Sequence, residues 1–159
     1  MITRRVPARR LLGVHPAIIL AVLDIVGLLV AGYLSAVELN GGVPSCGLVK
    51  GCEEVALSEY ARIGGIPVAV FGVVLSVALL GLALAWWKTD IYGLLLAHYG
   101  LSLVGVLFDG WFLYLQVFVI QAVCIWCVTY EVSLLLRFLI ALVVYLRQPR
   151  PDGVPRTVR

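Results

Sequence analysis

Residues 91–146 read IYGLLLAHYGLSLVGVLFDGWFLYLQVFVIQAVCIWCVTYEVSLLLRFLIALVVYL, and this stretch is apolar almost throughout. A helix crosses a bilayer in about 20 residues, so the stretch is too long for one crossing and must fold back once. A turn at 109–110 would leave a second segment well over the usual length, whereas a turn near 116–121 leaves two segments of ordinary length. The sequence therefore predicts membrane helices at about 91–117 and 122–146.

Two further apolar segments precede this stretch, at 18–39 and 66–87. The first carries a single interior charge, Asp24. It is longer than the apolar region of a secretory signal, and its best cleavage site is weak, so we expect a retained helix. Together the segments predict an all-α integral membrane protein built as a four-transmembrane-helix bundle.

The composition excludes a soluble domain. The chain has 159 residues, of which 62% are hydrophobic and only 13% charged, and so few charges could not cover so much apolar surface in water. The net charge of +3 comes from basic residues near the helix ends, which fits membrane orientation better than binding to nucleic acid. We expect a membrane redox domain over 1–147, with an outer loop at 40–65, and a disordered cytoplasmic tail over 148–159.

The positive charges also predict the orientation in the cell membrane. An even number of crossings places both termini and the loop after the second helix on one side, and cytoplasmic segments are rich in Lys and Arg. The outer loop holds only Lys50 and Arg62 among several Glu residues, and its segment 53–63 has the apolar spacing of a short amphipathic helix. The basic residues on the predicted cytoplasmic side are Arg4, Arg5, Arg9, Arg10, Lys88, Arg147, Arg150, Arg156 and Arg159.

Four cysteines are the candidate catalytic residues. Cys46 and Cys52 form a C-x5-C pair in the outer loop, and Cys124 and Cys127 form a C-x-x-C pair at the start of the fourth helix. This topology places all four at the outer, oxidising face of the membrane. Three helical residues advance about 300°, so the sulfurs of the C-x-x-C share one face and can form a disulfide reversibly.

Two other interpretations of the cysteines stay open. The four residues could form inert disulfides in a non-catalytic membrane scaffold, but a C-x-x-C disulfide closes too short a loop to stabilise much. They could also bind a metal as thiolates in a metal-handling protein, but an oxidising compartment does not keep thiolates free. We therefore favour redox chemistry and expect no metal site.

The cysteines belong to a wider pattern. The C-x5-C pair is followed by Ser58 and by GIPVAVFG at 65–72, and the C-x-x-C comes late in the chain. Over nearly the whole transmembrane core this pattern resembles the vitamin K epoxide reductase family, specifically its microbial members. Another family of membrane thiol oxidases carries its C-x-x-C in the first outer loop, so the order of motifs here argues against it.

The resemblance implies a four-helix bundle around a quinone pocket and a role for each cysteine. Electrons would pass from a thioredoxin-like protein to Cys46 and Cys52, then to Cys124 and Cys127, and then to a quinone of the menaquinone or ubiquinone type. Cys127 would react with the quinone, Cys124 would exchange with Cys52, and Cys46 would meet the partner. Some relatives carry a fused thioredoxin-like domain; we expect a separate partner here, reoxidised to support disulfide formation in exported proteins.

The resemblance also implies candidate substrate-binding residues. Ser58 matches a family serine near the active centre. Glu131 and Val68 stand at or near positions where the animal enzymes have Tyr and Asn, which argues for a plain quinone rather than vitamin K epoxide. Glu131 follows Cys127 by one helical turn and could handle the hydroquinone protons. Aromatic residues could line the pocket or simply pack, and the full set of candidates is Ser58, Phe71, Trp111, Phe112 and Glu131.

Other polar residues lie inside the predicted helices. His98, Asp109 and Gln116 share one face of the third helix. Ionisable groups within a membrane are candidates for function, although a satisfied polar network inside the bundle is at least as good an interpretation for His98. Asp24 and Arg137 are predicted to pair across helices, in the cytoplasmic half.

Overall fold

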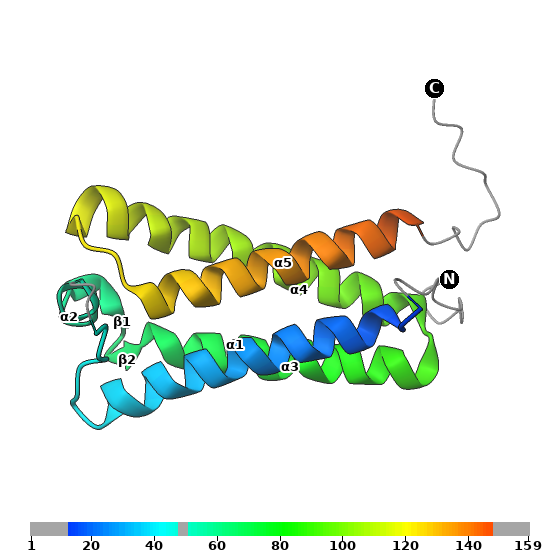
Figure 1. The fold of residues 1–159 in the computed structure, drawn as a ribbon, viewed down its shortest axis with the longest axis horizontal. Helices are drawn as coiled ribbons and strands as arrows, with labels where there is room; N and C mark the ends of the chain where they lie inside the picture. The colour runs from blue at the N-terminus through cyan, green and yellow to red at the C-terminus, as the bar shows by residue number, and fades with distance from the viewer. Residues whose placement is uncertain (1–12, 48–50, 148–159) are drawn as a thin grey trace.

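The computed structural model describes residues 13–47 and 51–147, and it contains a bundle of four long helices (Figure 1). Each of these helices is long and apolar enough to cross a membrane, which confirms the predicted fold class. The predicted tail at 148–159 and the N-terminal arginines lie outside the described residues. The long helices are α1 (Pro16–Leu39), α3 (Val68–Thr89), α4 (Tyr92–Tyr114), which a π-helical segment η2 (Leu115–Ile120) extends, and α5 (Ile125–Arg147).

Local sequence explains where the helices begin and end. Helix α1 starts at Pro16, whose missing N–H is no loss in a first turn, and His15 Nδ1 accepts a hydrogen bond from Ala17 N–H at 3.2 Å. Helix α3 ends where Asp90 takes a left-handed conformation with φ of 52°, and α4 begins two residues later. His15 Nε2 lies 3.2 Å from the Asp90 carboxylate, so the start of α1 is tied to this turn.

The fold-back predicted near 116–121 is present. The helical backbone continues to Ile120, and Gln121 then adopts φ of 57° without help from a Gly or Pro. The Ala122 N–H donates to the Gln116 carbonyl at 3.0 Å and closes this turn. The third membrane span is therefore Tyr92–Ile120, slightly longer than expected, and the last begins at Ile125.

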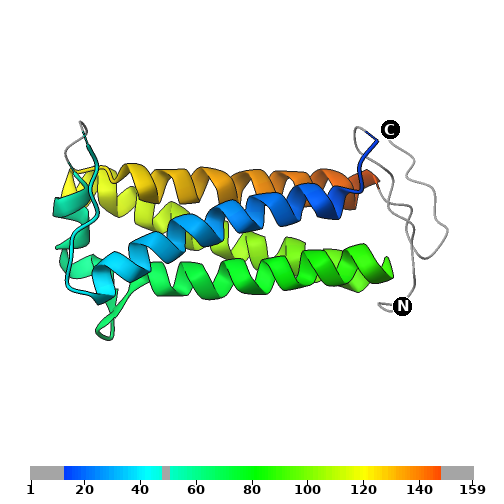
Figure 2. The same ribbon diagram turned by 60° about the horizontal axis from the view of Figure 1, so that its bottom comes forward.

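The helices pack as a ring in which α1 contacts α3 and α5, and α4 contacts the same two helices (Figure 2). The loop after α1 and the turn before α5 meet at one end of the bundle, which we call the cysteine end. The start of α1, the α3–α4 turn and the end of α5 meet at the other, which we call the turn end (Figure 1). All four cysteines lie at the first of these ends.

A buried ionic cluster links α1, α4 and α5 inside the bundle. Arg137 Nη1 lies 3.5 Å from Asp24 Oδ1, and His98 Nε2 lies 3.3 Å from Asp24 Oδ2. All three side chains are essentially inaccessible to solvent. The predicted pairing of Asp24 with Arg137 is thus confirmed, and His98 belongs to the same polar network. Gly27 makes room for the guanidinium, because a Cβ at this position would overlap Arg137 Nη2.

The loop between α1 and α3 contains a short helix, as expected, but not a continuous one over 53–63. Helix α2 covers Cys52–Ala56, a 3₁₀ turn η1 covers Glu59–Ala61, and strands β1 (Arg62–Ile63) and β2 (Ile66–Pro67) form a small antiparallel hairpin. Ser58 interrupts the helix because its backbone is extended, with ψ of 154°, while its hydroxyl donates to the Val55 carbonyl. The apolar spacing that predicted the longer helix gives no information about this turn, in which the serine hydroxyl competes with the helical hydrogen bonds of the backbone.

Candidate redox centre

The loop cysteines form a disulfide that is packed against the rest of the bundle. Cys46 and Cys52 are bonded, with their Cα atoms 5.8 Å apart, and Cys52 begins helix α2. Gly51, just before it, has φ of 133° and lies directly on the turn before α5. A Cβ at Gly51 would come within 2.6 Å of the Val123 carbonyl oxygen, so only glycine allows this approach.

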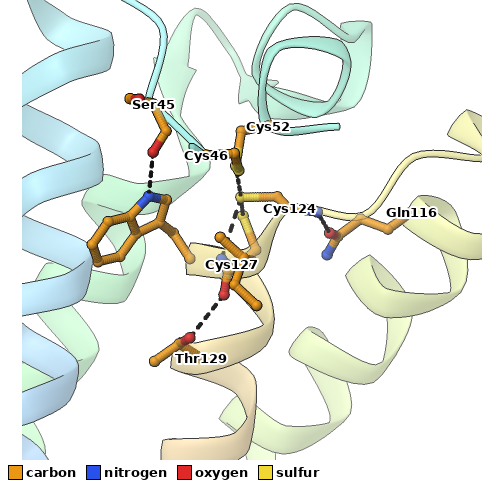
Figure 3. Close-up of a disulfide and its surroundings, with 9 residues drawn as sticks. Ser45, Cys46, Cys52, Gln116, Cys124, Cys127 and Thr129 are labelled. Carbon is orange, nitrogen blue, oxygen red and sulfur yellow. Dashed lines mark hydrogen bonds between the residues drawn. A yellow bond between two sulfur atoms is a disulfide. The ribbon is translucent and has the colours of Figure 1, made fainter. Parts of the chain in front are cut away.

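This packing brings the two cysteine pairs together (Figure 3). Cys52 Sγ lies 3.6 Å from Cys124 Sγ, and Cys127 Sγ lies 2.7 Å from Cys124 Sγ. Cys52 and Cys124 are each 1% exposed, so their contact is shielded from solvent. The sulfurs therefore form a series that runs from Cys46 through Cys52 and Cys124 to Cys127.

The two free thiols are not equivalent. The Cys127 thiol donates a hydrogen bond to Cys124 Sγ, which lowers the pKa of Cys124 to about 7 against the opposing effect of burial. The backbone N–H of Cys127, 3.3 Å from the same sulfur, adds to the shift. Cys124 is thus a thiolate over much of the neutral range, and a thiolate is the reactive form in disulfide exchange.

Gln116 connects Cys124 to Glu131. The Gln116 side-chain oxygen accepts the Cys124 backbone N–H at 2.9 Å, and its nitrogen donates to Glu131 Oε1 at 3.0 Å. Gln116 is 2% exposed, and it comes from the π-helical segment at the end of α4. Its amide therefore fixes the turn that carries the C-x-x-C relative to helix α5.

Trp126, between the two cysteines, holds the loop from the other side. Its indole N–H donates to the Ser45 carbonyl at 2.9 Å, and its ring contacts Tyr33 of α1 at a centroid distance of 4.8 Å. These contacts place the residue before Cys46 against the first turn of α5. Trp126 therefore anchors the loop that carries the first cysteine pair.

A cavity of about 320 Å³ lies beside the sulfurs. Its size is within the range of small-molecule sites, and its lining is largely apolar. Cys52, Cys124 and Cys127 all contribute to the wall. The polar groups around the cavity include Ser58 from the loop, Gln116 and Asp109 from the third span, and Tyr130 and Glu131 from α5.

The sequence-predicted binding residues divide into two groups. Ser58, Phe71, Phe112 and Glu131 line this cavity, whereas Trp111 is 58% exposed on the outside of the bundle and does not line it. Sequence reasoning singled out Asp109 and Gln116 as polar residues on one helix face but did not assign them to the site. It did not include Tyr130 among the candidates, although the Tyr130 hydroxyl donates to the Gly72 carbonyl and hydrogen-bonds Ser76.

Metal binding by thiolates is the alternative chemistry for the four cysteines. Within 13–47 and 51–147, no group of three or more His, Cys, Asp or Glu side chains is arranged to hold a metal ion.

Comparison with known proteins places the chain in a family. A search of curated proteins finds no match. The sequence profile described as the vitamin K epoxide reductase family matches residues 18–142, which include all four membrane spans in large part and all four cysteines. The chain therefore belongs to the vitamin K epoxide reductase family, whose members are membrane oxidoreductases that act on thiols and quinones.

Proposed function

We propose that this protein is a thiol:quinone oxidoreductase that reoxidises a separate thioredoxin-like protein and reduces a membrane quinone, in support of disulfide formation in exported proteins. The observation that carries the proposal is the 3.6 Å contact between Cys52 and Cys124, beside a cavity that Cys127 also lines. Two cysteine pairs in sulfur contact can pass electrons by exchange, whereas structural disulfides need no such contact.

The electron transfer begins at the loop. A thiolate of the reduced partner attacks Cys46, releases Cys52 as a thiolate, and the partner leaves as a disulfide. Cys52 then attacks Cys124 of an oxidised C-x-x-C and releases Cys127. Cys46 resolves the Cys52–Cys124 mixed disulfide, so the loop pair is oxidised again and Cys124 and Cys127 carry the two electrons.

In the structure the loop pair is bonded and Cys124 and Cys127 are free thiols. This is the arrangement expected after the exchange and before the reaction with quinone. In the next step the C-x-x-C passes two electrons to the quinone and becomes a disulfide. The quinone also takes up two protons and becomes the hydroquinone. We assign the reaction with quinone to Cys127, because it lies three residues farther into the membrane than Cys124, about 4.5 Å along the helix axis.

The cavity suits an apolar ring that arrives from the lipid. Phe71 and Phe112 contribute aromatic surface, and Val104 and Phe108 line the cavity while being 62% and 41% exposed on the outside of the bundle. Lining side chains that are also exposed are compatible with entry of the quinone from the lipid. A menaquinone or ubiquinone type of acceptor fits these features, and no metal takes part in the proposal.

The proposal includes an orientation in the cell membrane. The cysteine end would face outward, where the partner operates, and both termini would be cytoplasmic. Lys88 and Arg147 lie in the last turns of α3 and α5 at the turn end, in support of this orientation.

The test is quinone reduction by purified protein in detergent or lipid, with a reduced thioredoxin-like protein as donor and a short-chain benzoquinone or naphthoquinone as acceptor. Wild-type protein should reduce one quinone for each partner disulfide formed. Variants with Ala at Cys52 or Cys124 should lose this turnover. Cysteines that neither the donor nor the quinone can reduce or oxidise would instead indicate a non-catalytic scaffold.

A further inference from the structure

One carboxyl group in the cavity has no part in the sequence-based scheme. Asp109, on α4, lines the same cavity as the C-x-x-C, and its Oδ2 is buried without a hydrogen-bond partner. Glu131, on α5, also lines the cavity and has a buried, unpartnered oxygen, Oε2. Buried polar atoms of this kind are usually hydrogen-bonded, so two in one ligand-sized cavity indicate contact with a bound molecule.

Quinone reduction requires two protons, and the dithiol does not supply both equally well. The Cys127 thiol carries a proton, which it donates toward Cys124 Sγ. Cys124 is mostly a thiolate above pH 7 and then has no proton to give. A second proton donor is needed at the cavity, because a hydroquinone that receives only one proton stays an anion, which is costly in an apolar site.

We propose that Asp109 is a catalytic residue that carries this second proton to the quinone, while Glu131 relays the proton of the Cys127 thiol. The assignment rests on the proposed quinone reductase function. In this step the thiolate of Cys124 bonds to Cys127, two electrons enter the quinone, and its oxygens receive one proton from Asp109 and one through Glu131. The products are the disulfide, the hydroquinone and an ionised Asp109.

The cycle then restores Asp109. Reduction of the C-x-x-C by the loop dithiol brings two protons with two electrons. One proton stays on Cys127, and the other returns to Asp109, since Cys124 is left as a thiolate. Atoms and charge therefore balance over one turnover without a proton from another source.

Several charged and titratable groups surround the Asp109 carboxyl group. Arg137, Tyr130 and Glu131 on α5 interact with Asp109 electrostatically or face the same cavity, and Glu38 on α1 lies at the cavity's cysteine end. Within the described part of α3, no titratable side chain lines the cavity. A pH dependence that arises from Asp109 must therefore be separated from that of Glu131 and Cys124.

The experiment divides the cycle into its two half-reactions. Protein that has been reduced beforehand is mixed with a benzoquinone bearing one isoprenyl unit, and the rate of hydroquinone formation is followed from pH 6 to 10. Separately, oxidised protein is reduced by a small dithiol in the absence of quinone. Asp109→Asn should slow the quinone step about 100-fold, which is within the usual effect of a general acid, and leave thiol reduction within twofold.

The pH profile distinguishes proton donation from a structural role. The wild-type quinone step should lose rate in alkali as Asp109 ionises, and this alkaline decline should disappear in Asp109→Asn and shift in Asp109→Glu. Leu107→Ala, a change on α4 at a side chain that is 68% exposed and does not line the cavity, should keep the wild-type profile. If Asp109→Asn does not fold, an unshifted decline in Asp109→Glu overturns the proposal.

Other outcomes are equally informative. Equal quinone rates and profiles in wild type and Asp109→Asn would overturn the role of Asp109, and so would equal slowing of both half-reactions, which indicates a structural defect. If wild-type protein reduces no quinone while its cysteines still exchange, the proposed function itself fails.

Discussion

Cys52 Sγ and Cys124 Sγ lie 3.6 Å apart, although 72 residues separate them in the sequence. Both sulfurs are buried, and the contact joins the first turn of α2 to the residue before α5. Gly51 and the Trp126–Ser45 hydrogen bond hold the loop against the turn before α5. The close contact between the two sulfurs is therefore a consequence of the fold. The loop pair and the C-x-x-C therefore behave as one centre.

The contact predicts a selective cross-link. In the double variant Cys46→Ala/Cys127→Ala, mild oxidation should bond Cys52 to Cys124, since each has lost its other partner. The bond should appear in a non-reduced digest analysed by mass spectrometry.

The matched control is Cys52→Ala/Cys127→Ala, which leaves Cys46 and Cys124, a pair for which the described residues show no sulfur contact. This control should cross-link far more slowly. Equal cross-linking of the two variants would mean that the loop moves freely and that the observed contact does not direct exchange.

The pKa of Cys124 provides a second prediction. Its ordinary value near 9 falls to about 7 chiefly because the Cys127 thiol hydrogen-bonds the Cys124 sulfur. In protein with the loop pair oxidised, ultraviolet thiolate absorbance should therefore rise through pH 7 as one thiolate forms. Removing the donor in Cys127→Ala should move the rise to higher pH; an unchanged titration would mean that another group stabilises the thiolate.

Gln116 is predicted to matter for both stability and exchange. Gln116→Leu keeps the approximate size of the side chain but leaves the Cys124 N–H and Glu131 Oε1 without their partner. Each unpaired buried group costs about 1–3 kcal/mol, so the melting temperature should fall and thiol exchange at Cys124 should slow. Gln121→Leu, a change at an exposed residue near the same turn, serves as the control and should affect exchange little.

The membrane helices could be predicted well because each one depends only on the residues within its own segment. Each helix is recorded in a run of apolar residues, and the turn at 116–121 followed from the length that a bilayer allows. The pairing of Asp24 with Arg137 was also predictable, since a charge within an apolar span needs a partner.

The details of the centre were less accessible because they depend on contacts between distant segments. The end of the short helix at Ala56 reflects the local conformation of Ser58, which periodicity does not encode. Trp111 was grouped with Phe112 as an aromatic pocket candidate, yet neighbouring helical residues point in different directions, and only Phe112 lines the cavity. Nothing local marked Gln116 as the link between Cys124 and Glu131.

The orientation is tested by fusions that report the side of the membrane. Reporters placed after Arg10, Lys88 and Arg150 should all be cytoplasmic, because basic residues gather at these positions and an even number of spans separates them. A reporter within the loop, at Glu59, should be external. An external reading at any of the first three positions would contradict the proposed orientation.

The last prediction concerns the buried ionic cluster and compares two glycines of the same helix. A methyl group at Gly27 would overlap the Arg137 guanidinium, whereas one at Gly32 would meet no atom within 4 Å. Gly32→Ala should be neutral or stabilising by about 0.5–1 kcal/mol, because alanine favours the helix. Gly27→Ala should destabilise by about 1–3 kcal/mol through overpacking, and by more if Arg137 is displaced from Asp24.

Thermal unfolding in one detergent measures both variants of this glycine pair. The cause can be isolated by repeating Gly27→Ala in an Arg137→Met background, where the more flexible and uncharged side chain can yield space. If the overlap is with the guanidinium, the cost of Gly27→Ala should shrink there, a coupling that distant sites do not show. An equal cost in both backgrounds would place the strain elsewhere in α1 and remove Arg137 as the reason for glycine at position 27.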